Sequence, residues 1–347
     1  MAEKIASVDV QVLRDVPTPR ELRFAWSPGS VTRSSSIVLI RIRSVGLCGT
    51  DYHIFAGRHP FLQYPRVMGH ELAGEIVEAP SGSAFRVGQT VAVNPYLACG
   101  TCIACRKGKP NACVNISVLG VHADGGMCEL LAVPEQAILD ATGLTLDQAA
   151  MIEFLSIGHH AVTRAAVKTG SRVLVVGAGP IGIASGLFAR LRGAAVTLVD
   201  TRPTRLAYAR EALNFTDVIE ASPELPAALQ ERTGGEMFDV VFDATGALTA
   251  MAQSLNYVAH GGALVFVGVA PGDLVLSDPE FHKRETTLLA SRNALNEDFE
   301  QVIAAIKAGD IPTAALQTHS VPALDLPQRL PELIAEADHV LKAIAHF

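Results

Sequence analysis

The chain has 347 residues, of which 49% are hydrophobic, and its formal net charge is −7. This length favours two domains with a cleft between them, and the apolar content excludes a largely disordered chain. The acidic balance, with no basic run longer than Arg106–Lys109, argues against a nucleic-acid-binding surface.

The sequence contains neither a secretory signal nor a segment that could span a membrane. The first 22 residues carry charges throughout and lack the apolar stretch of a secretory signal. The longest uncharged apolar run, residues 173–189, is interrupted by glycine and is shorter than the roughly 20 residues that span a bilayer. We therefore expect a soluble, cytoplasmic protein that acts on a small molecule and binds neither membrane nor nucleic acid.

Residues up to about 150 contain short runs typical of β-strands, separated by glycine and proline. These runs cover residues 36–46, 71–80, 89–96 and 128–134. A β-rich domain is expected over residues 1–155.

From about residue 156, continuous apolar runs alternate with helix-like stretches. The expected strands cover residues 172–179, 195–200, 238–245, 263–270 and 287–291, and the expected helices cover residues 180–194, 202–214 and 247–259. This alternation predicts an α/β fold with a doubly wound parallel sheet over residues 156–290. Residues 291–347, with a helix near 297–309, are expected to return to the first domain.

The stretch "GAGPIG" lies between an expected strand and an expected helix. Gly177 permits a tight turn, Gly179 lets the backbone approach a pyrophosphate, and Gly182 lets helix and strand pack closely. Pro180 and Ile181 open the helix, whose N-terminus favours the phosphate charge. The alternative is that the glycines serve only the strand–helix turn.

An acidic residue, Asp200, ends the next expected strand at the spacing of a dinucleotide site. Its carboxylate would accept hydrogen bonds from the adenosine ribose and repel a 2′-phosphate, which favours NAD over NADP. Arg202 and Arg205 follow closely and could weaken that preference.

Four cysteines, Cys99, Cys102, Cys105 and Cys113, form C-x2-C-x2-C-x7-C. In a reducing cytosol clustered cysteines are more often metal ligands than disulfides, and four thiolates close a tetrahedral structural zinc site over residues 95–115. An iron–sulfur cluster and a nucleic-acid-binding zinc ribbon are the alternatives. Neither agrees with the rest of the chain.

A second set of potential ligands is spread along the chain as Cys48, His70, Glu71 and Glu153. A thiolate, an imidazole and a carboxylate with one open position make a catalytic zinc site. Each residue alone could be an ordinary core residue. Glu71 and Glu153 are interchangeable at this point: one would bind directly, and the other through water or from outside the ligand shell.

The neighbours His70 and Glu71 would point to opposite faces of an extended strand. Both reach one metal only if the backbone bends, for which Gly69 and Gly74 are candidates.

Together these motifs resemble the zinc-dependent medium-chain dehydrogenase/reductase family over essentially the whole chain. The matching stretches include "CGTDYHIF", "GHELAGEIV", "DGGMCELLAVP" and "MIEFLSIGHHAV". The chain is similar to the sorbitol and threonine dehydrogenase branch, and more closely to RspB-like proteins and L-galactonate or L-gulonate 5-dehydrogenases. The resemblance implies a GroES-like catalytic domain, a Rossmann NAD-binding domain, a site between them, one catalytic and one structural zinc per chain, and a homodimer or homotetramer.

The resemblance also implies roles for individual residues. Cys48, His70, Glu71 and Glu153 become the catalytic zinc set, Thr50 and His53 a proton relay, and Asp51 a support for a zinc ligand. The implied reaction is reversible oxidation of a secondary alcohol to a ketone, with hydride transfer to NAD. Thr50 could instead be a turn hydroxyl, and His53 an ordinary surface histidine.

Three residues depart from the family pattern: Phe154 replaces a proline, Gln89 an aspartate and Cys128 a small residue. A sugar-acid substrate requires a cation for its carboxylate. The candidates are Arg58, Arg66 and Arg292, with His122 as a polar neighbour.

The alternatives are a sorbitol- or threonine-type dehydrogenase, a zinc-independent quinone reductase, and a non-catalytic nucleotide- or metal-responsive regulator on the same fold.

Overall fold

The computed structural model describes residues 37–57 and 66–347, which divide into two compact units. Unit 1 consists of the residues up to Glu153 together with Leu295–Gly309 and Leu316–Phe347. Unit 2 consists of Phe154–Ala294 and Asp310–Ala315. No helix among the described residues combines the length and the apolar character that a bilayer crossing requires.

Unit 1 is built on a seven-stranded sheet among the described residues. Its pairing order is β14 (Gln317–Pro322), β15 (Lys342–His346), β1 (Ile37–Leu47), β2 (Glu71–Glu78), β3 (Thr90–Val93) and β7 (Ile138–Asp140), and β6 (Leu130–Pro134) also pairs with β1. The pairs are antiparallel except β14 with β15. The last strand of the chain therefore lies directly beside the first described one.

Short elements complete unit 1. A two-stranded sheet joins β4 (Tyr96–Leu97) and β5 (Ser117–Val118). The helices are α4 (Gly49–Phe55), α5 (Ile103–Arg106), α6 (Leu146–Ala150), α13 (Asn296–Ala308) and α15 (Leu326–Ala335), with 3-10 turns η1 (Pro110–Ala112), η2 (Glu135–Ala137) and η4 (Ala323–Asp325). The core packs apolar residues of β1, β2, β3 and β15 against α15.

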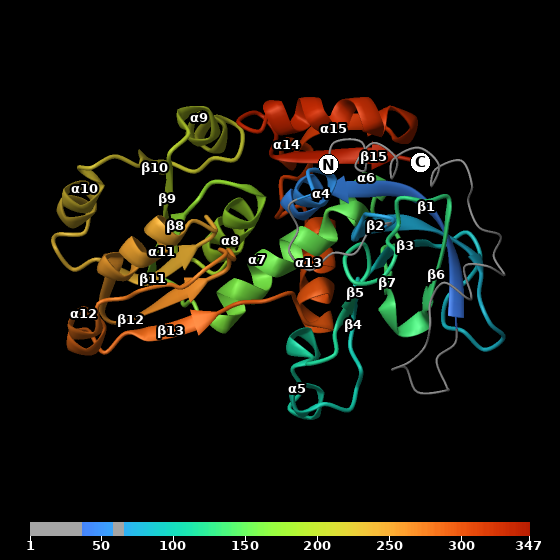
Figure 1. Ribbon diagram of the computed structural model, residues 1–347, viewed down its shortest axis with the longest axis horizontal. Coiled ribbons are helices and arrows are strands. Elements are labelled where there is room, and N and C mark those ends of the chain that lie inside the picture. The colour runs from blue at the N-terminus through green and yellow to red at the C-terminus, as the bar shows by residue number, and fades with distance from the viewer. Residues whose placement is uncertain (1–36, 58–65) are drawn as a thin grey trace. The chain divides into compact units, whose positions relative to one another are not determined.

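Unit 2 is a six-stranded sheet in which every pair is parallel (Figure 1). The order is β10 (Asp217–Glu220), β9 (Ala195–Asp200), β8 (Arg172–Val176), β11 (Phe238–Asp243), β12 (Val258–Phe266) and β13 (Thr287–Ala290). The central strands are buried on both faces, as their continuous apolar sequences require.

The helices of unit 2 connect consecutive strands. They are α8 (Pro180–Leu191), α9 (Pro203–Glu211), α10 (Leu225–Arg232), α11 (Leu248–Ser254) and α12 (Asp278–Lys283), with a 3-10 turn η3 (Leu255–Tyr257). Two helices have residues in both units, namely α7 (Ile152–Arg164) and α14 (Thr313–Leu316).

One expected helix of unit 2 is shorter than its sequence pattern indicated. The expected helix 247–259 ends in α11 and η3, and Val258 already starts β12, opposite Phe238 of β11. Tertiary pairing with β11 outweighs helix propensity there.

Candidate functional site

Cys48 lies in unit 1 at the point where β1 ends and α4 begins. The fully buried Asp51 carboxylate accepts hydrogen bonds from the Cys48 N–H (3.0 Å) and the Gly69 N–H (3.3 Å). One side chain therefore ties together the two segments that carry Cys48 and His70. The role implied for Asp51, support of a ligand, agrees with these contacts.

His70 is buried, and its Nδ1 lies 3.8 Å from Asp51 Oδ1. Burial alone would lower the pKa of the imidazole, but the Asp51 carboxylate and the Cys48 sulfur outweigh it and raise that pKa well above its ordinary value. Gly69 takes a φ of +93°, a conformation that favours glycine, and this bend precedes His70.

Glu71, at the start of β2, is fully buried and lies opposite Gly46 of β1. Lys342 of β15 is also buried, and its Nζ donates to both carboxylate oxygens of Glu71 at 2.7 Å and to the Leu47 carbonyl at 3.2 Å. A Cβ atom on Gly46 would come within 2.0 Å of Glu71 Oε2, so the carboxylate fills the space that a side chain would need. Burial alone would lower the pKa of Lys342, but the adjacent Glu71 charge has the opposite effect, and the net result is a raised pKa.

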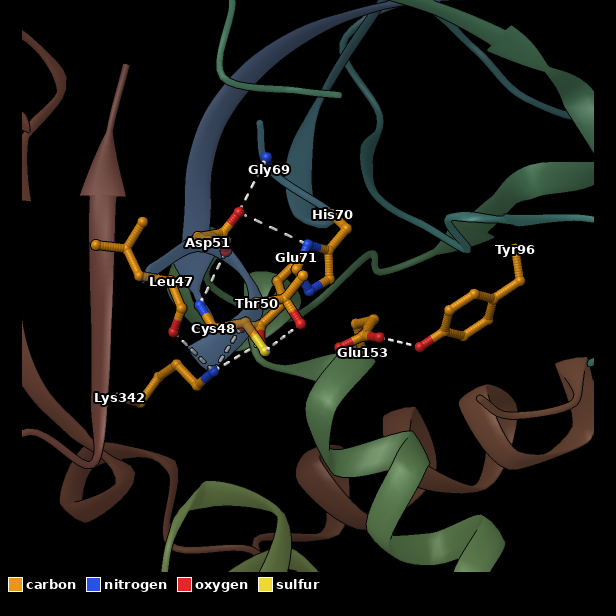
Figure 2. A network of polar contacts seen from close by, with 10 residues as sticks. All are labelled: Leu47, Cys48, Thr50, Asp51, Gly69, His70, Glu71, Tyr96, Glu153 and Lys342. Carbon is orange, nitrogen blue, oxygen red and sulfur yellow. Dashed lines mark hydrogen bonds and ion pairs between the residues drawn. The ribbon is translucent and has the colours of Figure 1, made fainter. Parts of the chain in front are cut away.

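Glu153, in the first turn of α7, is the second buried carboxylate (Figure 2). The Tyr96 hydroxyl donates a hydrogen bond to Glu153 Oε1, whereas Oε2 is buried and has no hydrogen-bond partner. Burial raises the pKa of Glu153 to about 7; the nearby Glu71 charge also raises it, and His70 opposes the shift.

The residues of this group fit a divalent metal ion. Ligand atoms of Cys48, His70 and Glu71 all lie within 4.8 Å of one another, and they offer the sulfur, nitrogen and oxygen donors that zinc accepts. Glu153 Oε2 is buried without a hydrogen-bond partner, which is costly unless another group satisfies it. Although His70 and Glu71 are adjacent, both contribute ligand atoms to the group.

The two expected relay residues lie on α4. Thr50 Oγ1 is 3.8 Å from Cys48 Sγ, and His53 is exposed three residues later. Residues three apart share one face of a helix, so Thr50 and His53 lie on the same side of α4.

The four-cysteine lobe surrounds α5. Sulfur–sulfur distances are 3.4 Å for Cys99–Cys113, 3.4 Å for Cys102–Cys105 and 3.8 Å for Cys102–Cys113, and all four sulfurs lie within 4.8 Å of one another. A tetrahedron with zinc–sulfur bonds of about 2.3 Å has edges of about 3.8 Å. The cysteines are free thiols, and their spacing fits a four-thiolate zinc site.

The cysteines of this lobe differ in the direction in which their thiol pKa is shifted. Backbone N–H groups of Thr101 and Cys102 lower the pKa of Cys99 to about 5. Burial and the neighbouring sulfurs raise the pKa of Cys105 to about 12. Gathering four thiolates therefore needs a cation to offset their charge.

The glycine-rich loop of unit 2 borders a cavity of about 540 Å³. Gly177 has a φ of +103°, and a Cβ atom on Gly182 would come within 1.8 Å of the Gly177 carbonyl oxygen. Gly179 precedes Pro180 and Ile181 at the start of α8, as the motif predicts. Residues lining the cavity include Gly177, Gly179, Asp200, Thr201, Arg202 and Arg205.

Asp200 ends β9 at the edge of this cavity. Its carboxylate accepts hydrogen bonds from the Ala178 N–H (2.6 Å) and the Arg202 N–H (2.9 Å), so it joins the glycine-rich loop to the segment after β9. The Arg205 guanidinium lies beside Gly179, since a Cβ atom added to that glycine would be 3.4 Å from it. The cavity thus holds both an acidic and a basic group near the loop.

The four candidates for binding a substrate carboxylate lie in different parts of the chain. Arg66 forms an ion pair with Asp124 at 3.1 Å, and the His122 ring accepts a hydrogen bond from the Val118 N–H. Arg58 lies outside the described residues, and Arg292 belongs to unit 2.

The three departures from the family pattern are accommodated in the fold. Gln89 donates a hydrogen bond to Asp140, the buried Cys128 thiol donates to the Leu130 carbonyl, and Phe154 is fully buried.

Sequence analysis missed two residues that contact the buried carboxylates, Tyr96 and Lys342. Lys342 lies 271 positions from Glu71, and Tyr96 lies 57 positions from Glu153. A lysine within the apolar run "VLKAIAH" was the only hint, because lysine is rarely buried unless it is paired.

Comparisons with known proteins cover most of the chain. Residues 34–143 match the alcohol dehydrogenase GroES-like domain, and residues 180–308 match the zinc-binding dehydrogenase family. L-galactonate-5-dehydrogenase of Escherichia coli K12 is 44% identical over 310 residues, which are 89% of this chain and 91% of that protein. The starvation-sensing protein RspB of the same strain is 31% identical over 315 residues, or 89% of this chain and 87% of that protein.

A solved structure is similar over a comparable length. The crystal structure of an alcohol dehydrogenase (rspB) from E. coli CFT073, complexed with the cofactor NADH, matches with a TM-score of 0.82 and 29% identity. The match covers 91% of this chain and 93% of that one.

Proposed function

Because this chain belongs to the zinc-binding alcohol dehydrogenase family with a GroES-like domain, we propose that it interconverts a secondary alcohol of a sugar acid or polyol and the corresponding ketone, with NAD(H) as hydride carrier. The observation that carries the metal-dependent part is the group of ligand atoms from Cys48, His70 and Glu71, with Glu153 beside it.

The substrate class rests on relatives. L-galactonate-5-dehydrogenase acts on a sugar acid by its name, and so does 2-dehydro-3-deoxy-L-galactonate 5-dehydrogenase of Pseudoalteromonas atlantica, at 30% identity. D-altritol 5-dehydrogenase of Agrobacterium fabrum, at 32% identity, is named for a polyol. A hexonate similar to L-galactonate or L-gulonate is therefore our first choice, and a hexitol the second.

The chemistry divides between bound groups and the chain. Zinc supplies Lewis acidity to the substrate oxygen, and nicotinamide supplies the hydride acceptor. Cys48 and His70, with a buried carboxylate, hold the metal. Thr50 Oγ1 would accept the substrate hydroxyl proton as it releases its own hydroxyl proton, and the exposed His53 on the same side of α4 would pass a proton to solvent.

Two further features belong to the proposal. The carboxylate of Asp200 at the cavity favours NAD over NADP because it would repel a 2′-phosphate. The lobe of Cys99, Cys102, Cys105 and Cys113 holds a structural zinc, since four thiolates leave no open position for a substrate.

Self-association as a homodimer or homotetramer is also proposed. β13 is an edge strand of the unit 2 sheet, with Leu288 41% exposed, and an edge strand offers free backbone groups to a second copy. Analytical ultracentrifugation of the purified chain distinguishes a monomer from either assembly.

The test is a screen for NADH formation with L-galactonate, L-gulonate, sorbitol and L-threonine, run before and after chelation and again after zinc is restored. We expect the highest kcat/KM with a hexonate, loss of the activity on chelation, and its recovery with zinc. A preference for L-threonine would overturn the substrate class, and full activity in protein shown to lack zinc would overturn the metal-dependent mechanism.

A further inference from the structure

The two buried carboxylates near Cys48 and His70 have different partners, although the sequence pattern alone left them interchangeable. By distance, Glu71 is the nearer carboxylate: one of its oxygens lies within 4.8 Å of the Cys48 and His70 ligand atoms, in a group that does not include Glu153. The hydrogen bonds of the two carboxylates point to the opposite assignment.

Both oxygens of Glu71 are already engaged. Lys342 Nζ lies 2.7 Å from each of them and uses its remaining donor on the Leu47 carbonyl. A cation that approached Glu71 would meet the repulsion of a buried ammonium group at close range. Glu71 is therefore best described as the counter-ion of Lys342.

Glu153 has one engaged oxygen and one open oxygen. The Tyr96 hydroxyl donates to Oε1, and Oε2 is buried without a hydrogen-bond partner. In the view of Figure 2, Tyr96 lies on one side of the Glu153 carboxylate and Cys48 and Thr50 lie on the other. The open oxygen is the one a metal would satisfy.

Tyr96 is itself held firmly, which suits it to orient another side chain. Its N–H donates to Asn94 Oδ1 (3.0 Å), and Asn94 Nδ2 donates to Asn296 Oδ1 (2.7 Å) of α13. Its ring meets the Phe299 ring edge-on, with centroids 6.2 Å apart. The hydroxyl therefore projects from an anchored ring in a buried setting.

We infer that Tyr96 is a positioning residue for Glu153: by holding Oε1 it presents Oε2 as the carboxylate ligand of the metal, while Lys342 retains Glu71 outside the ligand set. This inference rests on the metal site of the proposed function. It assigns to Tyr96 a role that acts through Glu153, because the phenol itself is directed at the carboxylate.

The experiment measures zinc affinity in the full-length protein by competition with a chromogenic chelator. Tyr96→Phe keeps the ring that contacts Phe299 and removes only the hydroxyl. It is made alone, with Glu153→Gln, and with Glu71→Gln. Tyr208→Phe is the matched control, because it removes a phenol hydrogen bond to the Ala315 carbonyl in unit 2.

Tyr96→Phe is expected to weaken binding of the more labile zinc by about 10- to 100-fold, as for other groups that orient metal ligands. The same change should have less than about a twofold effect when Glu153→Gln is present, and its full effect when Glu71→Gln is present. Tyr208→Phe should leave the affinity unchanged. The visible spectrum of the cobalt-substituted protein should change in Tyr96→Phe and stay unchanged in Tyr208→Phe.

Equal effects of Tyr96→Phe in the Glu153→Gln and Glu71→Gln backgrounds would overturn the inference, because a merely structural role does not depend on which carboxylate is present. An unchanged affinity and cobalt spectrum in Tyr96→Phe would overturn it as well. In both cases the wild-type protein still binds two zinc ions and the proposed function stands. Wild-type protein that binds zinc only at the four-cysteine lobe would instead refute the metal site itself.

Discussion

Replacing Lys342 with methionine tests the buried ion pair that supports the candidate site. Lys342 is 1% exposed and Glu71 is 0% exposed, and all three ammonium donors have an acceptor, two on Glu71 and one on Leu47. Lys342→Met leaves the Glu71 charge buried without a partner, and removing one member of a buried pair costs about 3–5 kcal/mol. We expect the free energy of unfolding of unit 1 to fall by that amount.

The assay is hydrogen exchange of backbone amides in peptides that cover β1, β2 and β15, because these strands carry or border the pair and report on unit 1 alone. The double variant Lys342→Met with Glu71→Gln removes both charges, and it should recover most of the lost protection. A loss below about 1 kcal/mol in Lys342→Met, or a double variant as unstable as the single one, would refute the reasoning.

The remaining predictions concern three other positions. Gly46→Ala should destabilise the protein, since the new Cβ would lie 2.0 Å from Glu71 Oε2 and would displace the carboxylate from Lys342, whereas Gly49→Ala, whose Cβ position is open, should not; thermal unfolding of both variants checks this. Asp200→Ser keeps a hydrogen-bond acceptor but removes the charge, so the kcat/KM ratio of NAD over NADP should fall by about tenfold or more, and an unchanged ratio would contradict the role of the carboxylate. Hydrogen bonds from Thr142, opposed by partial burial, lower the pKa of Asp140, so its contribution to stability is present at neutral pH and is lost as pH falls through that lowered pKa. Asp140→Asn should therefore reduce the urea midpoint slightly at pH 7, with a difference from wild type that shrinks in acid; a constant difference would argue against the linkage.

The α/β fold class could be predicted because the central strands of unit 2 are buried on both faces and read as continuous apolar runs, and it is confirmed. β10 and α10 were missed for the same physical reason. The strand Asp217–Glu220 is only half-buried at the sheet edge, and Leu225–Arg232 buries just Leu225 and Leu229. Neither segment carries the apolar periodicity on which the other predictions depended.

At the candidate site, the motifs indicated Cys48 and His70 but not what surrounds them. Lys342 reaches Glu71 because β15 pairs with β1, which in turn pairs with β2. No local pattern encodes that register. Tyr96 and Glu153 come from a short strand and a helix start, and a tyrosine in a run such as "NPYL" reads as a core residue. Contacts between segments far apart in the sequence, rather than local propensity, therefore decide which carboxylate keeps an oxygen without a hydrogen-bond partner.

The most direct test of a zinc-dependent dehydrogenase is anomalous diffraction at the zinc edge from crystals grown with NAD. We predict two peaks per chain, one among Cys99, Cys102, Cys105 and Cys113, and one bound by Cys48 and His70. A map with no peak beside Cys48 and His70, and with both side chains turned away while the dinucleotide is bound, would contradict the account.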